Sequence, residues 1–240
     1  MTAPPRVFER LAEAYRARPP YPPALVARLS ELAGPGRTVV DLGAGTGLLA
    51  VPLARAGHRV FAVEPAGAML AVCAEVAAGL PVDPVQAPAE STGLGPVGAG
   101  LVLLADAVQW VRPDAAGAEA RRLLGPDGVA AAVVPEPLDT PFMRGLRMLL
   151  ARANPKAESR SLTARVRHWL SLAAGPGRPE VETWEQRVGL DRETMRGVVR
   201  SLSYGGPALA PPGWSGSSRR WTCSGNDRGG NGRERSASAG

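Results

Sequence analysis

The sequence predicts an α/β fold of three layers, in which helices cover both faces of a mostly parallel sheet. Short apolar runs that are typical of strands alternate with helix-like segments between residues 38 and 134. These runs are apolar on both faces, as strands between two helical layers require. With 240 residues and 45% hydrophobic content, the chain is long enough to bury one such core.

The individual elements follow from these patterns. Strands are expected over residues 38–42, 59–64, 82–86, 101–105 and 129–134. Helices are expected over residues 48–56, 66–78 and 113–124, ended respectively by Gly57, by Gly79 and by a turn at residues 125–128. Residues 5–32 are predicted to form a helical region that the prolines between residues 19 and 23 interrupt.

The pattern is weaker beyond residue 138. It predicts helices over residues 140–153 and 162–172 and a strand over residues 181–188. Asp191, followed three residues later by Thr194, predicts the N-cap of a helix that runs to about residue 202.

Three regions are therefore expected. Residues 1–37 form an N-terminal helical region, and residues 38–204 form the core. Residues 205–240 contain nine glycines, six serines and three prolines, with Leu209 as the only large aliphatic residue. Such a segment cannot bury enough apolar surface to offset its ordering entropy, so we predict that it is disordered.

Composition limits the class of protein. The net charge is +6, but five arginines and two acidic residues in residues 205–240 supply +3 of it, which argues against a nucleic-acid partner. No apolar run is long enough to span a membrane, and no signal peptide is recognisable, so a cytoplasmic location is the default. Two distant cysteines, Cys73 and Cys223, predict neither a disulfide framework nor a metal site. We expect a monomer, with Cys73 buried and His58 in solvent.

The strongest signal of function is the run Asp41-Leu42-Gly43-Ala44-Gly45-Thr46-Gly47, which follows a predicted strand and opens a helix. Glycines in such a loop let the backbone turn tightly and let a ligand approach it closely. The dinucleotide fingerprint G-x-G-x-x-G would place its third glycine at position 48, where Leu48 stands.

An acidic residue lies at the expected distance from this loop. Glu64 ends the second predicted strand, 21 positions after Gly43. A carboxylate there can accept hydrogen bonds from both hydroxyls of a ribose, and Pro65 keeps Glu64 extended. Two interpretations of Asp41 stay open. Its side chain either caps the following helix or loop, or it contacts the ammonium group of a ligand.

These motifs resemble those of class I, Rossmann-like S-adenosylmethionine-dependent methyltransferases. The G-x-G-x-G loop resembles the family's first motif, and Glu64-Pro65 followed by Met69-Leu70 resembles the second. Ala89-Glu90 resembles the region that covers the adenine, although Thr92-Gly93 replaces the usual Leu-Pro. The resemblance implies S-adenosylmethionine as cofactor and these cofactor-binding residues: Asp41, Gly43, Ala44, Gly45, Gly47, Glu64, Pro65, Ala89, Glu90 and Asp106.

The segment from Asp106 to Val111 resembles the small-molecule branch of the family, which includes trans-aconitate methyltransferase. That branch often carries His-Trp where this chain has Gln109-Trp110, and a glutamine amide is not a plausible base. The segment from Tyr15 to Pro22 resembles a lid that precedes the core and covers the cofactor.

Methyl transfer from a sulfonium is an in-line displacement, which alignment in a dry site can accelerate. An aromatic face can stabilise the sulfonium by cation–π attraction. Tyr15, Tyr21 and Trp110 are the candidate catalytic residues, with ordinary packing as the alternative role for each.

Several alternatives stay open. The resemblance implies a last strand after the late helix, and nothing after Tyr204 reads as one, so the sheet is predicted to lack it. The preferred function is methyl transfer to a small-molecule acceptor. The first alternative is a cofactor-binding protein that has lost activity through its altered C-terminus, in which this last strand is missing. A nicotinamide oxidoreductase and a nucleic-acid methyltransferase are less favoured.

Overall fold

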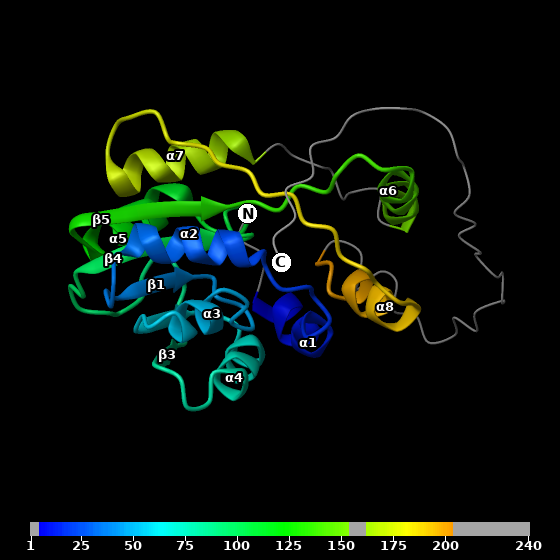
Figure 1. Ribbon diagram of the computed structural model, residues 1–240, viewed down its shortest axis with the longest axis horizontal. Coiled ribbons are helices and arrows are strands. Elements are labelled where there is room, and N and C mark those ends of the chain that lie inside the picture. Colours follow the sequence, from blue (N-terminus) through cyan, green and yellow to red (C-terminus); the bar gives the residue numbers. More distant parts are fainter. Residues whose placement is uncertain (1–4, 154–161, 204–240) are drawn as a thin grey trace, which may run out of the picture. The chain divides into compact units, whose positions relative to one another are not determined.

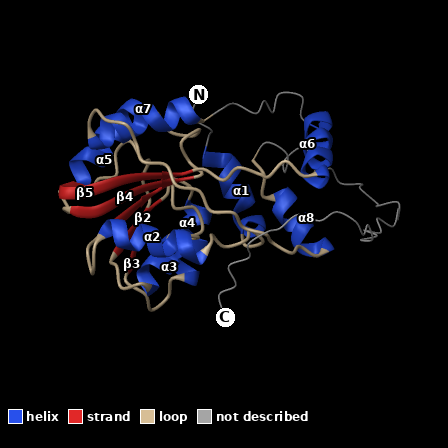
Figure 2. Ribbon diagram, turned by 45° about the horizontal axis from the view of Figure 1, so that its top comes forward, coloured by secondary structure: helices blue, strands red, loops and turns tan. Residues whose placement is uncertain are grey.

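Five parallel strands form the sheet in the order β3-β2-β1-β4-β5. The computed structural model describes residues 5–153 and 162–203, and in this part of the chain helices lie on both sides of the sheet (Figures 1 and 2). The predicted three-layer α/β class is confirmed, and the described sheet is wholly parallel.

The elements alternate as the sequence predicts. In chain order they are α1 (Pro5–Tyr15), α2 (Pro23–Ala33), β1 (Val39–Leu42), α3 (Ala50–Arg55), β2 (Val60–Val63), α4 (Gly67–Val76), β3 (Val82–Val85), β4 (Ala99–Ala105), α5 (Pro113–Leu123), β5 (Leu124–Val133), α6 (Pro141–Ala153), α7 (Thr163–Ala174) and α8 (Arg192–Arg200).

Alternate residues of the strands enter different hydrophobic clusters, as the pleat requires. Leu101 and Leu103 of β4 pack with α2 and α3, whereas Val102 and Leu104 pack with α5 and α7. The four residues of β1 are all buried. Both faces of the central strands are thus covered, which explains why their sequences are continuously apolar.

The connection between α5 and β5 differs from the prediction. Residues 125–128 were expected to form a turn before the strand, but β5 begins at Leu124, which pairs with Ala99. The register then jumps to Val129 opposite Leu101, so the turn residues lie inside the strand as an irregularity. A side chain at Gly125 would come within 3.0 Å of the Gly98 carbonyl oxygen, so glycine permits this close approach.

The predicted strand over residues 181–188 is wrong. Residues 177–190 have no regular secondary structure, and Val181 and Val188 are exposed. Trp184 packs against the cluster that contains α2, and the Glu182 carboxylate accepts a hydrogen bond from Arg28 at 2.7 Å. Trp184 is thus the one large apolar residue of this segment that packs against the core, and the segment has no continuous apolar face of the kind that a strand in the sheet needs.

The late helix begins as predicted. The Asp191 carboxylate accepts a hydrogen bond from the Thr194 amide at 2.7 Å and caps α8. In the described part of the chain no strand follows β5, whose only neighbour in the sheet is β4. Residues 205–240, which we predict to be disordered, lie outside the described residues. None of the described helices has the length and apolar character that a membrane crossing needs.

The prediction for His58 is wrong. This side chain is 1% exposed, and its ring nitrogens lie 2.7 Å from the Ser30 hydroxyl and 2.9 Å from the Arg37 carbonyl oxygen. Both partners precede β1, so the imidazole joins α2 and its following turn to the start of β2. The prediction that Cys73 is buried is confirmed, because its exposure is 0%.

Candidate functional site

The glycine loop lies at the carboxyl ends of β1 and β2. The amides of Gly43 and Ala44 donate to the Val63 carbonyl at 2.8 and 3.0 Å, which holds the loop against β2. A Cβ atom on Gly47 would lie 2.8 Å from the Cys73 sulfur, whereas a Cβ on Gly45 would meet no atom within 4 Å. Gly47 is thus required by packing, and Gly45 leaves open space beside the loop.

The Glu64 carboxylate joins this loop to the start of α4. Its Oε2 accepts a 3.1 Å hydrogen bond from the Gly45 amide, and its Oε1 accepts a 2.9 Å bond from the Ala66 amide. Burial raises the pKa of Glu64 above its ordinary value, although these two amide bonds act in the opposite direction. The carboxylate is therefore fixed at the carboxyl end of β2, 7% exposed, beside the open side of Gly45.

Asp41 lies one residue before the end of β1 and is 2% exposed. Burial and, to a lesser extent, the charge of Glu64 raise the pKa of Asp41 to about 7, and a hydrogen bond from the Ala50 amide lowers it. Ala50 is the first residue of α3, which fits the capping interpretation of Asp41. The buried Oδ1 atom of Asp41 has no hydrogen-bond partner, however, so it is also available to a donor group of a ligand.

Asp106 follows β4 with a φ of 46°, in the left-handed region that residues other than glycine rarely adopt. The Arg18 guanidinium donates to its Oδ2 at 2.9 Å, and the Gln109 amide donates to its backbone carbonyl at 2.9 Å. Arg18 lies in the predicted lid segment from Tyr15 to Pro22 but is not among the predicted site residues. The Asp106 amide also donates to the Val133 carbonyl of β5 at 2.9 Å, so this residue is held from its own loop, from β5 and from the N-terminal region.

Tyr15 and Tyr21 lie among these carboxylates. Burial, together with the charges of Asp106 and Glu64, raises the pKa of Tyr15 to about 12, and only Arg18 acts in the opposite direction. Burial and the charges of Asp106 and Asp41 raise the pKa of Tyr21 above its ordinary value. Both phenols therefore stay protonated near neutral pH. The structure thus brings five of the predicted site residues into one neighbourhood, namely Tyr15, Tyr21, Asp41, Glu64 and Asp106.

Trp110 is connected to this neighbourhood through a residue that the sequence analysis missed. The Phe8 ring of α1 lies edge-on to Trp110, with centroids 5.4 Å apart, and edge-on to Tyr15 at 6.2 Å. Phe8 could have been predicted from its position in the same helix as Tyr15, two turns earlier, because residues at that spacing lie on one face of a helix. Three aromatic rings from two distant segments consequently form one cluster.

Glu9 is a second residue that the sequence analysis missed. Its two carboxylate oxygens accept 2.8 Å hydrogen bonds from the amides of Gly67 and Ala68, at the start of α4. The residue that precedes α4, Ala66, has no capping side chain. The absence of a capping residue before α4 was the only local signal for Glu9, because the capping side chain comes from α1. The two hydrogen bonds of Glu9 fix α1 to the core close to Glu64.

The remaining predicted cofactor residues are placed as follows. Ala89 is buried in the cluster that contains Leu42 and Val63. Glu90 accepts a 2.8 Å hydrogen bond from the Arg112 amide at the start of α5. Pro65 is exposed and Ala44 is buried in the loop. Contact of these residues with a cofactor stays a prediction. The contact that the structure gives Glu90 is structural, because its carboxylate binds the backbone amide at the N-terminus of α5.

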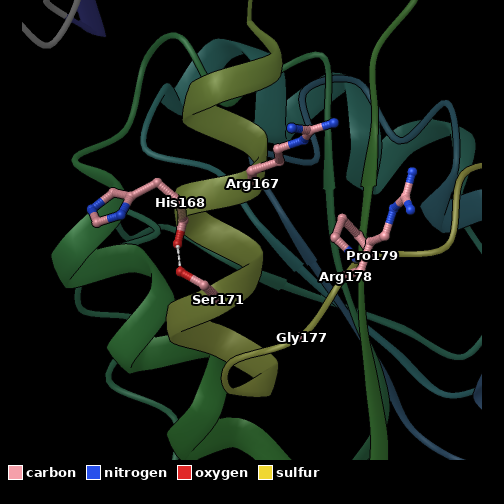
Figure 3. Close-up of a pocket in the computed structure, with 6 residues that line it drawn as sticks. All are labelled: Arg167, His168, Ser171, Gly177, Arg178 and Pro179. Atoms are coloured by element: carbon pink, nitrogen blue, oxygen red, sulfur yellow. Dashed lines mark hydrogen bonds between the residues drawn. The ribbon is translucent and has the colours of Figure 1, made fainter.

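An open hollow lies elsewhere, along α7. It measures about 600 Å³, and Figure 3 shows its lining residues: Arg167, His168, Ser171, Gly177, Arg178 and Pro179. None of these is a predicted site residue. His168 is half exposed, and its ring lies 2.9 Å from the Asp114 carboxylate. Within the described residues, no three His, Cys, Asp or Glu side chains are grouped to hold a metal.

Comparisons with known proteins agree with this geometry. The model of a family described as a methyltransferase domain matches residues 40–132. Uncharacterized methyltransferases of Mycobacterium tuberculosis and Mycobacterium bovis are 40% identical over 114 residues, which are 47% of this chain and 45% of theirs. The chain therefore spans about half the length of the curated relatives it matches.

Solved structures extend the comparison beyond that segment. A protein from Anaeromyxobacter dehalogenans, provisionally named a Type II methyltransferase, is 30% identical, with a TM-score of 0.56 over 78% of this chain and 79% of that one. The YcgJ protein of Bacillus subtilis shares the fold, with 21% identity and a TM-score of 0.51 over 72% of this chain and 76% of that one.

Proposed function

The chain belongs to the class I, Rossmann-like family of S-adenosylmethionine-dependent methyltransferases, and we propose that it transfers a methyl group from this cofactor to a small-molecule acceptor. We place it in the branch that includes trans-aconitate methyltransferase, on the resemblance of the segment from Asp106 to Val111. In this proposal residues 1–37 act as a lid, residues 38–204 act as the core, and residues 205–240 take no part in the site.

The observation that carries the proposal is the position of Glu64 beside Gly45. The carboxylate is buried and held by two backbone amides, yet each of its oxygens has further capacity to accept a hydrogen bond. A Cβ atom added to Gly45 would have no protein atom within 4 Å, so the space beside this residue is open. A ribose that enters this space would find an acceptor for its two hydroxyls.

The charge of the site supports a cationic ligand. Asp106 acts on both Tyr15 and Tyr21, as does the cation Arg18. Glu64 acts on Tyr15, and Asp41 acts on Tyr21. The free Oδ1 atom of Asp41 suits the ammonium group of the cofactor. The residues present therefore fit S-adenosylmethionine, which the family uses.

The bound cofactor would supply a methyl group on a positively charged sulfur. The chain's own residues would orient the acceptor and exclude water, and we assign these roles to Tyr15, Tyr21 and Trp110. Their rings offer faces that attract a sulfonium, and the raised pKa of Tyr15 keeps its hydroxyl neutral. No base is assigned, because the position after β4 where relatives carry histidine is Gln109, whose amide already donates to Asp106.

The second candidate is a cofactor-binding protein without turnover. The observation in its favour is the position of β5, which has a single neighbour among the described strands. Parallel strands at an open edge leave backbone groups unpaired, and this can loosen the acceptor side of the sheet. The cofactor loops of this proposal follow β1, β2, β3 and β4, so cofactor binding would survive such a change.

A thermal melt distinguishes these functions. Purified full-length protein is melted alone and with S-adenosylmethionine, S-adenosylhomocysteine or NAD. A selective ligand at a hundred times its dissociation constant adds about 2.7 kcal/mol of stability. Stabilisation by the adenosyl ligands alone supports the proposal, and stabilisation by NAD alone contradicts it. Methyl-labelled cofactor is then incubated with small-molecule extracts, and binding without any transfer would favour the second candidate.

A further inference from the structure

Arg18 contacts three separate parts of the candidate site, namely Tyr15, Asp106 and Ser201, and the proposed function gives it no role. It lies in the link between α1 and α2, and its side chain is 19% exposed. Its guanidinium carbon lies 4.1 Å from the centre of the Tyr15 ring. One terminal nitrogen donates to Asp106 at 2.9 Å, and Nε donates to the Ser201 hydroxyl at 3.1 Å.

The other terminal nitrogen donates to the Ser201 backbone carbonyl at 3.3 Å. Ser201 is fully buried and caps the carboxyl end of α8. Each of the three nitrogens of the Arg18 side chain thus donates to a protein acceptor, and a second N–H remains on each terminal nitrogen. Its rigid fork joins three elements that are far apart in the sequence.

The packing around Arg18 makes this junction tight. A Cβ atom on Gly197 of α8 would collide with the Cβ of Ala17, the residue before Arg18. The helix and the link are therefore in direct contact at this point. Displacement of α8 would remove two of the hydrogen bonds that orient the guanidinium toward Asp106.

We propose that Arg18 is a positioning residue of the cofactor site: it fixes the Asp106 carboxylate and the Tyr15 ring, and it makes both depend on the end of α8 through Ser201. Asp106 is in the left-handed region, a conformation that persists only where surrounding contacts hold it. Arg18 supplies a side-chain contact from outside the Asp106 loop, in addition to the 2.9 Å backbone hydrogen bond that the Asp106 amide donates to Val133 of β5. This inference rests on the proposed function, since Asp106 is a predicted cofactor residue.

The test compares affinities for S-adenosylhomocysteine, measured by calorimetry on the full chain. Loss of a charge-assisted hydrogen bond to Asp106 in Arg18→Met should weaken binding about tenfold. Ser201→Ala, which removes one of the acceptors, should weaken it by a smaller factor. The matched control is Arg16→Met, which removes another arginine of this region whose partners, Glu13 and Glu75, are exposed. Its effect should be less than about twofold.

A double mutant separates positioning from a general effect on folding. If Arg18 acts through Asp106, then Arg18→Met combined with Asp106→Asn should bind no more weakly than the worse single variant. Multiplying effects, or an unchanged affinity of Arg18→Met, would overturn the proposal. If Arg18→Met does not fold, the same comparison is made with Arg18→Lys, which keeps the charge but not the fork. A folded wild-type chain that fails to bind S-adenosylhomocysteine would instead refute the proposed function.

Discussion

The Gly45 amide donates a 3.1 Å hydrogen bond to the Glu64 carboxylate, and this bond connects the loop after β1 to the end of β2. It orients a buried carboxylate beside the open side of Gly45, where an added Cβ would meet no protein atom within 4 Å. The two residues together define the place where we expect the ribose of the cofactor.

A methyl group at Gly45 should therefore impair binding more than folding. Gly45 has a φ of 56°, so Gly45→Ala should cost about 1–2 kcal/mol of unfolding free energy. Its added methyl group would occupy the proposed ligand space, and the affinity for S-adenosylhomocysteine should fall by at least about tenfold. Urea unfolding and calorimetry measure the two effects.

Gly36 offers a matched control for this substitution. It has a φ of 64°, and a Cβ added there would also meet no atom within 4 Å, but it lies in the turn before β1. Gly36→Ala should lose a similar amount of stability and keep its affinity. Equal affinities of the two variants would show that the space beside Gly45 is not a ligand site.

Gly47 should respond differently, because its Cβ would lie 2.8 Å from the Cys73 sulfur. Gly47→Ala should lose about 2–4 kcal/mol, from overpacking added to backbone strain. Removing the sulfur in a Gly47→Ala, Cys73→Ala double variant should recover part of that loss. Chemical denaturation of the four proteins checks this. A double variant whose losses simply add would mean that the contact with Cys73 is not the cause.

Asp41 should make stability and cofactor binding depend on pH. Its folded-state pKa, raised to about 7 from an ordinary value of 3.8, means that the folded protein holds a proton which the unfolded chain releases. The resulting stability is fully present below about pH 4 and is lost as the pH rises through 7. A cationic ligand should bind more tightly above pH 7, where Asp41 is charged.

Asp41→Asn should remove this dependence. At pH 8 the variant without ligand should be more stable than the wild type, by on the order of 1–3 kcal/mol, because no buried charge lacks a partner. Its affinity for S-adenosylmethionine should vary little between pH 6 and pH 8. Thermal melts and calorimetry test both points, with Asp83→Asn, a half-exposed carboxylate of β3, as control. The same pH profile in wild type and Asp41→Asn would assign the titration to another group.

His58 should be structural. His58→Ala would leave the Ser30 hydroxyl and the Arg37 carbonyl without their partner and would open a cavity, so a loss of about 2–4 kcal/mol is expected. The affinity of the folded variant for S-adenosylhomocysteine should stay within about twofold of wild type. A surface histidine, as the sequence suggested, would show no loss in a urea melt.

Local signals account for what could be predicted from the sequence. The apolar runs, the Gly43–Gly47 loop, the Glu64 position and the Asp191 cap each depend on residues close together in the chain, and the structure has them where expected. The pattern at residues 181–188 was misleading, because Val181 and Val188 are exposed and Trp184 alone of its large apolar residues packs against the core.

Contacts between distant residues could not be predicted. Glu9 caps α4 across 58 positions, and Arg18 holds Asp106 across 88. In the sequence Glu9 is an ordinary charged residue of a helical region, and such residues more often face solvent. Arg18 belongs to the segment from Tyr15 to Pro22 that resembles a lid, but this resemblance does not reveal Asp106 as its partner. His58 likewise follows a glycine at the end of a helix, and only the fold places it beneath Arg37.

The most direct test of the account is a calorimetric titration of S-adenosylhomocysteine into the full-length wild type and into Glu64→Gln. Glutamate has two acceptor oxygens, whereas glutamine has one oxygen and an NH2 group that only donates. Glutamine therefore cannot accept from both backbone amides and from both ribose hydroxyls. We expect one site per wild-type chain, no heat with NAD, and at least about tenfold weaker binding by a folded Glu64→Gln. A folded wild type that does not bind S-adenosylhomocysteine, or equal affinity in the variant, would contradict the account.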